Sequence, residues 1–233
     1  TKDGDDYRIT GNKTWITHAA RTHVMTLLAR TNPDSTDHRG LSMFLAAKNP
    51  GTDAVPCPTT GMTGGEIEVL GYRGMKEYEL AFDNFHVKGE NLLGGEEGKG
   101  FPYIMQHFAL ERLVMGVNAH ARAEFALEYA LQYMSERTTF GQTINKYQAL
   151  RHRYTDLYAD MEICKTYNYN VAYRLNKGEY VVKEATISKL KSTKMADEVI
   201  YDCLQFLGGY GYMEDYPMAR LLRDSRLGPI GGG

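Results

Sequence analysis

The sequence predicts an α+β protein in which a β-domain is followed by an antiparallel four-helix bundle. The first ninety or so residues consist of short β-prone runs separated by Gly and Pro, which is typical of a β-sandwich or open barrel. From residue 98 the apolar period becomes that of long helices with brief connections, which indicates a bundle. We therefore expect a β-domain over residues 1–94 and a helical domain over residues 95–233.

The β-domain should begin with a hairpin. Residues 7–17 form two β-rich runs around Gly11 and Asn12, and such a Gly-Asn pair between β-rich runs is a strong hairpin signal. Further strands are expected at residues 25–30, 41–46, 65–70 and 77–87.

Three long helices and a shorter one should form the helical domain. The first, over residues 101–137, carries apolar residues on nearly every face, as a helix buried at the centre of a bundle would. The second covers residues 147–176 and ends at Lys177 and Gly178. The third covers residues 181–207, and we expect the glycines that follow to form a left-handed cap. The last should begin at Pro217, a residue suited to a first helical turn.

Composition and charge exclude several classes of protein. A net charge of −2 and a pI near 6.4 give no signature of nucleic-acid binding. The three cysteines form no C-x-x-C pair and the histidines show no ligand spacing, so we expect no metal and a reducing compartment. No apolar run approaches the length of a membrane span. The chain begins at Thr1 without Met and ends on three glycines, so we expect a fragment cut at both ends.

Three segments could carry chemistry, and the first two of them also have a plainer interpretation. Trp15, Ile16 and Thr17 end a β-rich run, where a Trp usually packs in a core; the alternative is an aromatic edge beside a flavin, with the Thr17 hydroxyl donating to a ring nitrogen. Arg137 follows a long helix and usually such an Arg only complements the helix dipole. With the hydroxyls and aromatic ring that follow, it could instead clamp a pyrophosphate and stack a base. The run from Gln205 has three glycines within four residues, which lets the backbone approach a ligand closely.

Together these segments resemble the acyl-CoA dehydrogenase family. The resemblance is carried by Trp-Ile-Thr, by Arg-x-Thr-Phe-Gly between helices, and by Gln-x-x-Gly-Gly-x-Gly-Tyr followed by Pro-x-x-Arg-x-x-Arg-Asp. Residues 82–101 resemble the family's passage from β-domain to helical domain. The resemblance covers essentially the whole chain, and it implies that the family's N-terminal helical domain, first flavin-contacting β-segment and final helix are absent.

The resemblance implies FAD as cofactor and an acyl-CoA thioester as substrate. A carboxylate would remove the α-proton, the β-hydride would pass to the flavin, and an electron-transfer flavoprotein would accept the electrons. The family also implies a homo-oligomer, dimer or tetramer, in fatty acid or branched-chain amino acid metabolism, located in the bacterial cytoplasm or the mitochondrial matrix. The cofactor contacts that the resemblance implies are Trp15, Ile16, Thr17, Arg137, Thr139, Phe140, Gln148, Gln205, Gly208 and Gly209.

The position of the catalytic base departs from the commonest family pattern. Many members carry a Glu shortly after the Arg-Asp pair, and Gly232 stands in that position here. In the branch that resembles isovaleryl-CoA and long-chain acyl-CoA dehydrogenases, the base lies in a Leu-Glu-Arg triplet, which Glu111 and its neighbours match. The resemblance further implies that the Gly232 N–H stabilises the thioester oxygen as negative charge develops.

The residues themselves also single out Glu111. Its helical neighbours are Phe108, Val114 and Met115, so it projects from an apolar face. The plainer interpretation is a buried Glu paired with a distant Arg. An unpaired carboxyl in apolar surroundings has a raised pKa, which suits proton abstraction near neutrality.

Four residues are candidates for substrate contact. The resemblance implies that Phe108 and Arg112 lie near the acyl-CoA, with Arg112 positioning it. Met75 and Lys76 stand where many relatives carry small polar residues, and the preceding block, residues 64–70, resembles methylsuccinyl-CoA dehydrogenases. Lys76 could pair with a second substrate carboxylate, although an exposed lysine is the plainer interpretation.

Two other functions remain open at this point. The same fold could serve an O₂-reactive flavin oxidase or monooxygenase, and Glu111 with the intact glycine run favours the dehydrogenase. The chain could also be a non-catalytic helical interaction module.

Overall fold

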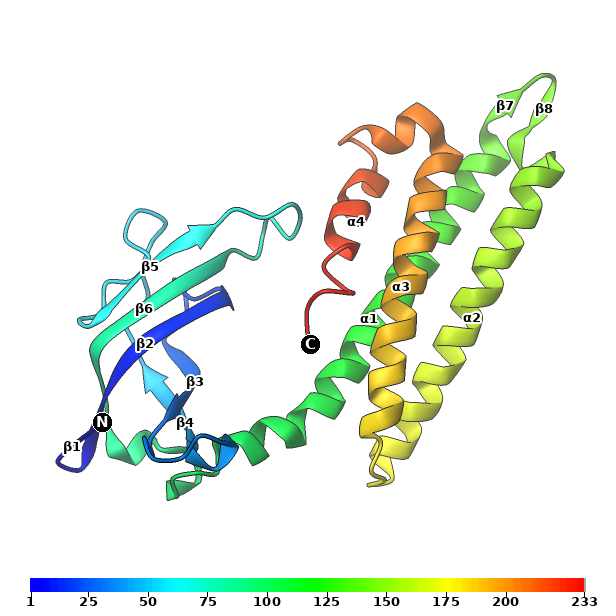
Figure 1. Cartoon of the computed structure of the whole chain (residues 1–233). Coiled ribbons are helices and arrows are strands. Elements are labelled where there is room, and N and C mark those ends of the chain that lie inside the picture. The colour runs from blue at the N-terminus through cyan, green and yellow to red at the C-terminus, as the bar shows by residue number, and fades with distance from the viewer. Residues whose placement is uncertain (233) are drawn as a thin grey trace. The chain divides into compact units, whose positions relative to one another are not determined.

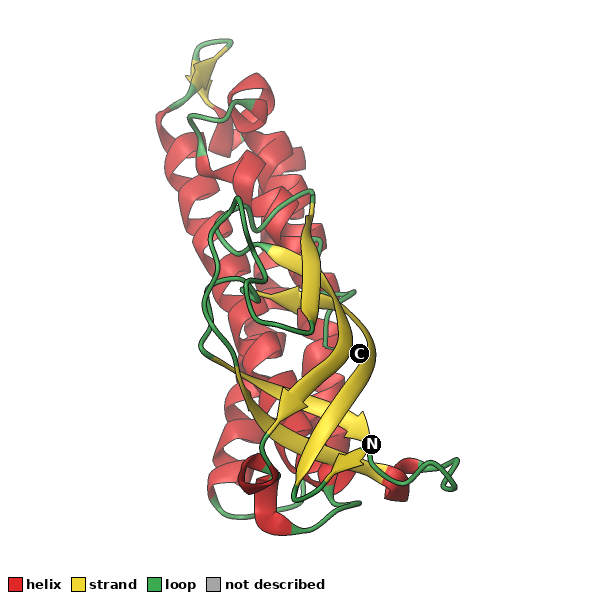
Figure 2. Ribbon diagram, turned by 90° about the vertical axis from the view of Figure 1, so that its left-hand side faces the viewer, coloured by secondary structure: helices red, strands yellow, loops and turns green. Residues whose placement is uncertain are grey.

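The computed structural model describes residues 1–232, which form two compact units that divide between Gln106 and His107. Strands make up most of the regular structure in the first unit and helices in the second (Figures 1 and 2). The α+β class predicted from the sequence is therefore confirmed. We keep residue 94/95 as our proposed domain boundary, because Gly94 and Gly95 have φ values of +76° and +69° just before the first long helix.

The first unit contains an antiparallel four-stranded sheet and a separate two-stranded ladder. The sheet has the order β1-β2-β6-β5, and β3 pairs with β4. Alternate residues of both ladders share one core, with Phe44, Tyr78 and Phe85 almost fully buried. The strands are β1 (Lys2–Asp3), β2 (Asp6–Thr17), β3 (Val24–Arg30), β4 (Leu41–Ala47), β5 (Met62–Ile67) and β6 (Glu77–Val87).

The hairpin predicted at Gly11 and Asn12 is wrong. β2 is one continuous strand, and both of its halves pair with β6. Gly11 has a φ of +151° and lies where the register shifts, so its freedom serves a β-bulge instead of a turn. The strand predicted at residues 65–70 is also displaced, because β5 begins three residues earlier, at Met62.

The second unit consists of long helices side by side, and the predicted helix bounds are confirmed to within one residue (Figure 1). A short hairpin, β7 (Thr138–Thr139) and β8 (Gln142–Thr143), joins the first two helices. The helices of residues 1–232 are α1 (Gly100–Glu136), α2 (Gln148–Asn176), α3 (Val182–Leu207) and α4 (Pro217–Ser225). Gly208 caps α3 with a φ of +58° but a ψ of −134°, so the predicted left-handed helical cap is wrong in its ψ.

The prediction that α1 is buried on nearly every face is wrong for the described chain. One face contributes Ala123, Ala126 and Leu127 to the bundle core, while Val114 and Phe125 are 53% and 47% exposed. The apolar composition of α1 therefore exceeds what the other helices of this unit cover.

A buried polar cluster ties the three long helices together. Asn168 of α2 is fully buried, and its Nδ2 lies 3.0 Å from the Gly116 carbonyl of α1, 3.0 Å from Ser192 Oγ of α3, and 2.9 Å from His120 Nδ1. Ser188 Oγ donates to Asn168 Oδ1 at 2.5 Å. Such a network specifies one register of the helices, because a shift of any helix would leave buried polar groups unpaired.

Candidate cofactor pocket and catalytic turn

A cavity of about 560 Å³ lies at the end of the bundle where α1 stops and α3 ends. Segments almost seventy residues apart in sequence form its walls: the end of α1 with β7, and the end of α3 with the 3₁₀ turn Gly208–Tyr212. The lining residues are Tyr133, Arg137, Thr139, Ile144, Gln205, Phe206, Leu207, Gly208, Gly209, Tyr210 and Met213.

The polar groups of this cavity, which we call the Arg137 pocket, suit an anionic ligand. Arg137 is exposed and supplies a guanidinium group, while Thr139 and Gln205 supply a hydroxyl and an amide. A Cβ added to Gly208 or Gly209 would meet no atom within 4 Å, so the backbone there is open to a ligand. The rings of Tyr133 and Tyr210 lie 6.2 Å apart between centroids and add an aromatic wall. This combination of a cation, polar groups, open backbone and aromatic rings is compatible with a phosphate-bearing ligand that also carries a ring.

Two of the cofactor residues predicted in the helical unit do not line the Arg137 pocket. Phe140 is fully exposed at the turn between β7 and β8, where it has a φ of +49°. Gln148 is exposed at the first position of α2. Neither side chain is therefore part of the cavity that Arg137 and Gln205 line.

The turn of α1 around Glu111 is open on its outer side. Glu111 is exposed, so the apolar surroundings expected for its carboxyl are not provided by residues 1–232. Arg112 points elsewhere: its guanidinium lies 5.3 Å from the centroid of the Phe108 ring, and its Nη1 donates to Thr186 Oγ1 at 3.3 Å. The plainer interpretation, a buried Glu paired with a distant Arg, is also wrong in its burial, since Glu111 is exposed.

Gly232 lies against the same part of α1. A Cβ added to Gly232 would clash with Sδ of Met115, which is one helical turn after Glu111. The φ of Gly232 is +70°, which favours glycine at this position. Among residues 1–232, no backbone carbonyl accepts a hydrogen bond from the Gly232 N–H. The two positions that the sequence suggests for a catalytic base or oxyanion donor are thus brought together by the fold.

In the β unit, Thr17 ends β2 beside an acid that the sequence analysis missed. Thr17 Oγ1 donates to Glu77, with distances of 2.9 Å and 3.0 Å to the two carboxylate oxygens, and Glu77 is buried. Trp15 is 62% exposed and has a φ of +59°, so the interpretation of Trp15 as a core residue is wrong. Ile16 pairs with Tyr78 of β6. The sequence did hold a signal for Glu77. It is an acidic residue at the start of a β-rich run, and acidic residues are uncommon in strands.

Lys76 is held by two carboxylates of its own chain. Its Nζ lies 2.6 Å from Glu66 Oε2 and 3.4 Å from Asp53 Oδ1, and the Glu66 hydrogen bond raises the pKa of Lys76. Met75 beside it is partly exposed. The plainer interpretation was an exposed lysine; the structure has Lys76 half-buried and paired with acids of its own chain.

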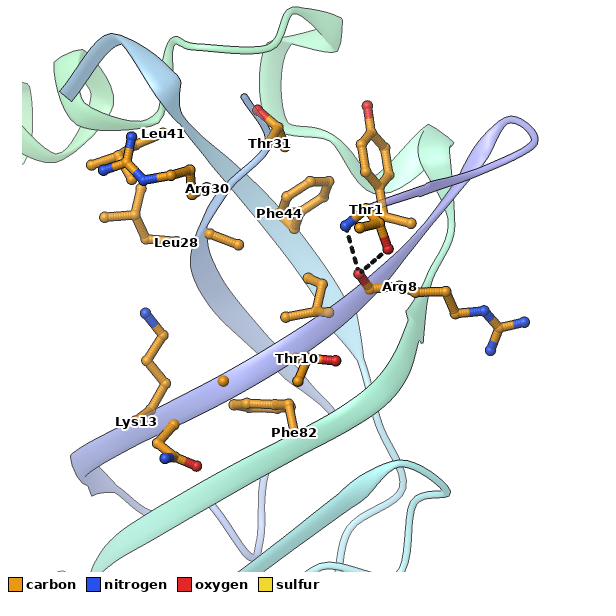
Figure 3. A pocket seen from close by; sticks show the side chains of 15 residues that line it. Thr1, Arg8, Thr10, Lys13, Leu28, Arg30, Thr31, Leu41, Phe44 and Phe82 are labelled. Carbon is orange, nitrogen blue, oxygen red and sulfur yellow. Dashed lines mark hydrogen bonds between the residues drawn. The ribbon is translucent and has the colours of Figure 1, made fainter. Parts of the chain in front are cut away.

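A second cavity, of about 270 Å³, lies in the β unit between β2 and β3 (Figure 3). Its floor is apolar, with Leu28, Phe44 and Phe82, while Lys13 and Arg30 lie near its rim (Figure 3). At one end, the amino group of Thr1 donates to the Arg8 carbonyl at 2.9 Å.

Comparison with known proteins identifies this pair of units. The sequence profile described as "Acyl-CoA dehydrogenase, middle domain" matches residues 1–85, and "Acyl-CoA dehydrogenase, C-terminal domain" matches residues 98–233. The chain belongs to the acyl-CoA dehydrogenase family. The family resemblance predicted from the sequence is therefore confirmed.

The relatives include enzymes of this family from bacteria and eukaryotes. The chain is 49% identical to (2S)-methylsuccinyl-CoA dehydrogenase of Cereibacter sphaeroides, over 97% of the chain and 41% of that protein. It is 33% identical to mitochondrial isovaleryl-CoA dehydrogenase of Pongo abelii, over 100% of the chain and 53% of that protein. A crystal structure of acyl-CoA dehydrogenase from Geobacillus kaustophilus superposes with a TM-score of 0.92 at 33% identity, covering 100% of the chain and 59% of that structure. The chain spans about half the length of the relatives it matches.

The acyl-CoA dehydrogenase fold also reveals pocket residues that the sequence analysis missed. Tyr133, Tyr210 and Met213 line the Arg137 pocket beside the predicted residues. Tyr133 lies four residues before Arg137, so helical periodicity places both on one face of α1, and this spacing could have found it. No helix of residues 1–232 is long and apolar enough to cross a membrane.

Proposed function

We propose that this chain provides the β-domain and helical domain of an FAD-dependent enzyme that oxidises an acyl-CoA thioester between its α- and β-carbons. The observation that carries the proposal is the convergence of Arg137, Thr139, Gln205, Gly208 and Gly209 on one cavity. The residues of that cavity fit the cofactor, because they offer a cation for the pyrophosphate, open glycine backbone and aromatic walls. Trp15, Ile16 and Thr17 would contact the flavin ring from the β-domain.

The geometry of α1 favours an oligomer as the working form. Glu111 and Arg137 are 26 residues apart on one helix, which corresponds to about 39 Å at 1.5 Å per residue. One extended dinucleotide is too short to be held at Arg137 and to present its ring near Glu111. The Arg137 pocket would then hold the cofactor of a second subunit, in a dimer or tetramer, and Phe140 and Gln148 would complete that contact from their exposed positions.

The chemistry of the chain's own residues begins with the α-proton. Glu111 would remove this proton from the thioester, and the Gly232 N–H would donate to the thioester oxygen as negative charge develops there. Arg112 and Phe108 would position the acyl-CoA beside Glu111. Bound FAD supplies the acceptor for the hydride that leaves the β-carbon, and electrons would pass on to an electron-transfer flavoprotein.

For the substrate, we propose a short branched dicarboxylic acyl-CoA of the methylsuccinyl type. The support is the 49% identity to (2S)-methylsuccinyl-CoA dehydrogenase. Lys76 would not bind the distal carboxylate directly, since Glu66 and Asp53 already neutralise it. Met75 would contribute an adaptable apolar contact near the acyl entry. The enzyme would work in the bacterial cytoplasm or, in a eukaryote, the mitochondrial matrix.

Anaerobic titration of the purified flavoprotein with a panel of acyl-CoA thioesters tests this function. We expect methylsuccinyl-CoA to bleach the flavin absorbance at lower concentration than isovaleryl-CoA or butyryl-CoA. Reduction of a dye acceptor or an electron-transfer flavoprotein should exceed O₂ consumption. Faster O₂ consumption would indicate an oxidase instead, and a protein that binds no flavin would indicate a non-catalytic module.

A further inference from the structure

A row of polar side chains runs down one face of α3. Lys189, Thr193 and Asp197 are spaced at i, i+4 and i+8, so they lie one above another on the helix. Lys189 is 6% exposed and Thr193 is 2% exposed, which is unusual for a lysine. Thr193 Oγ1 donates to the Lys189 carbonyl at 2.8 Å, which links the two residues within the helix. We call these three residues the α3 row.

The α3 row contacts the segment that follows α4. The first contact along this segment is made by Asp197, the most C-terminal residue of the row. Asp197 Oδ2 lies 3.6 Å from Nη1 of Arg226. Burial raises the pKa of Asp197, while Ser225 and Arg226 oppose that rise by favouring the charged form.

Later residues of the segment contact residues of α3 that are progressively nearer to its N-terminus. Thr193 packs against Gly228 so closely that an added Cβ would lie 3.2 Å from Thr193 Cγ2. Lys189 Nζ donates to the Pro229 carbonyl at 3.2 Å. Asp197, Thr193 and Lys189 therefore contact successively later residues of the segment.

The segment held in this way ends at Gly232, beside Met115 and the turn of α1 that carries Glu111. Internal turns stiffen it, because the amides of Ile230 and Gly231 donate to the Leu227 carbonyl at 2.9 Å and 2.8 Å. The position of the Gly232 N–H relative to α1 thus depends on where the α3 row anchors residues 225–229.

We propose that Lys189 is a positioning residue for the reaction, which acts by anchoring the Pro229 carbonyl and so placing the Gly232 N–H opposite Glu111. This inference rests on the proposed function, because it assigns the Gly232 N–H to the thioester oxygen. Burial and the nearby Arg112 charge lower the pKa of Lys189, so a cation is costly to keep at this buried place. A contact that served packing alone would be better made by an apolar side chain.

The test compares Lys189→Met and Lys189→Arg with a control, Lys194→Met, in the complete enzyme. Lys194 is an exposed lysine on the same helix. The first readout is hydrogen–deuterium exchange of residues 226–232, which does not depend on turnover. We expect at least tenfold faster exchange of the Gly228, Ile230 and Gly231 amides in Lys189→Met, partial recovery in Lys189→Arg, and no change in Lys194→Met.

The second readout separates placement from binding. We expect Lys189→Met to lower kcat about tenfold while KM for the acyl-CoA changes less than threefold, with Lys189→Arg restoring most of kcat. A 3-thiaacyl-CoA, which has an acidic α-proton but no β-hydride to lose, should ionise less readily when bound to Lys189→Met. Unchanged exchange would overturn the anchoring, and faster exchange with unchanged kcat and analogue ionisation would overturn the positioning role. If the wild-type protein oxidises no acyl-CoA, the proposed function fails, and the exchange data alone still decide whether Lys189 anchors the segment.

Discussion

The two ends of α1 differ in how much of their proposed site the described chain builds by itself. At the Arg137 end, residues of α1, β7, α3 and the following 3₁₀ turn enclose a cavity with its cation, amide and open glycines in place. At the Glu111 end, the carboxylate and the apolar Val114 beside it are exposed, and Gly232 packs against Met115, one helical turn after Glu111. The comparison shows that the helical unit forms the Arg137 pocket by itself, whereas residues 1–232 leave Glu111 exposed.

The largest effect is expected from removing the base. Glu111→Gln should lower kcat by about 10²–10⁴-fold, because general base catalysis contributes that much, while leaving flavin binding unchanged. Glu128→Gln, at an exposed position on the same helix, is the matched control. Steady-state kinetics and the flavin spectrum measure both properties, and a Glu111→Gln enzyme with near-normal turnover would remove Glu111 from the mechanism.

A large loss of stability is expected from the buried cluster around Asn168 of α2, which contacts the middle of α1 at Gly116 and His120. Asn168→Ala should lower the free energy of unfolding by about 2–4 kcal/mol, since it removes a buried hydrogen-bond partner of Ser188, Ser192 and the Gly116 carbonyl. Urea denaturation measures this change. The exposed Asn118→Ala is the control, and equal stability of the two variants would show that the cluster does not hold the helices in register.

At the Arg137 end, the expected change is in cofactor affinity. Arg137→Ala should weaken FAD binding roughly ten- to a hundredfold, which corresponds to about 1.5–3 kcal/mol for a charge-assisted contact. Gln205→Ala should weaken FAD binding less, because it removes a neutral donor. Calorimetric titration of apoprotein with FAD measures both, and Arg151→Ala, at an exposed site on α2, serves as control. Unchanged affinity in both pocket variants would show that the pocket does not hold the cofactor.

The smallest effect concerns pH. Burial lowers the pKa of His120 below its usual 6.5, although the charges of Glu124 and Glu162 oppose this and Lys165 adds to it. The folded state therefore prefers neutral His120, so its contribution to stability is present above pH 6.5 and is lost as pH falls through the lowered pKa. The free energy of unfolding, measured by urea denaturation, should fall from pH 7 to pH 5 by no more than about 1.4 kcal/mol per pH unit from this one group. His120→Asn should flatten that part of the profile, and an unaltered slope would point to other groups.

The sequence by itself determined the class of fold, the helix bounds and the family, because helical periodicity and turn residues act locally and the motifs are specific as a set. It also assigned Arg137 and Gln205 to the same site, since both belong to one motif set, and both line the same cavity. Gly11 shows where local signals fail. Its conformational freedom suggested a turn, but it forms a β-bulge, because both halves of β2 pair with β6.

Only the tertiary structure decided which side chains meet. Glu77 was missed because its contact with Thr17 crosses between strands 60 residues apart. Lys76 could not be assigned from sequence because its two acidic partners lie on other segments. The burial of Glu111 was overestimated because an apolar face predicts a covering surface without saying which residues provide it. The α3 row became visible only when residues 225–229 were placed along α3, since contacts between distant segments depend on packing and not on local pattern.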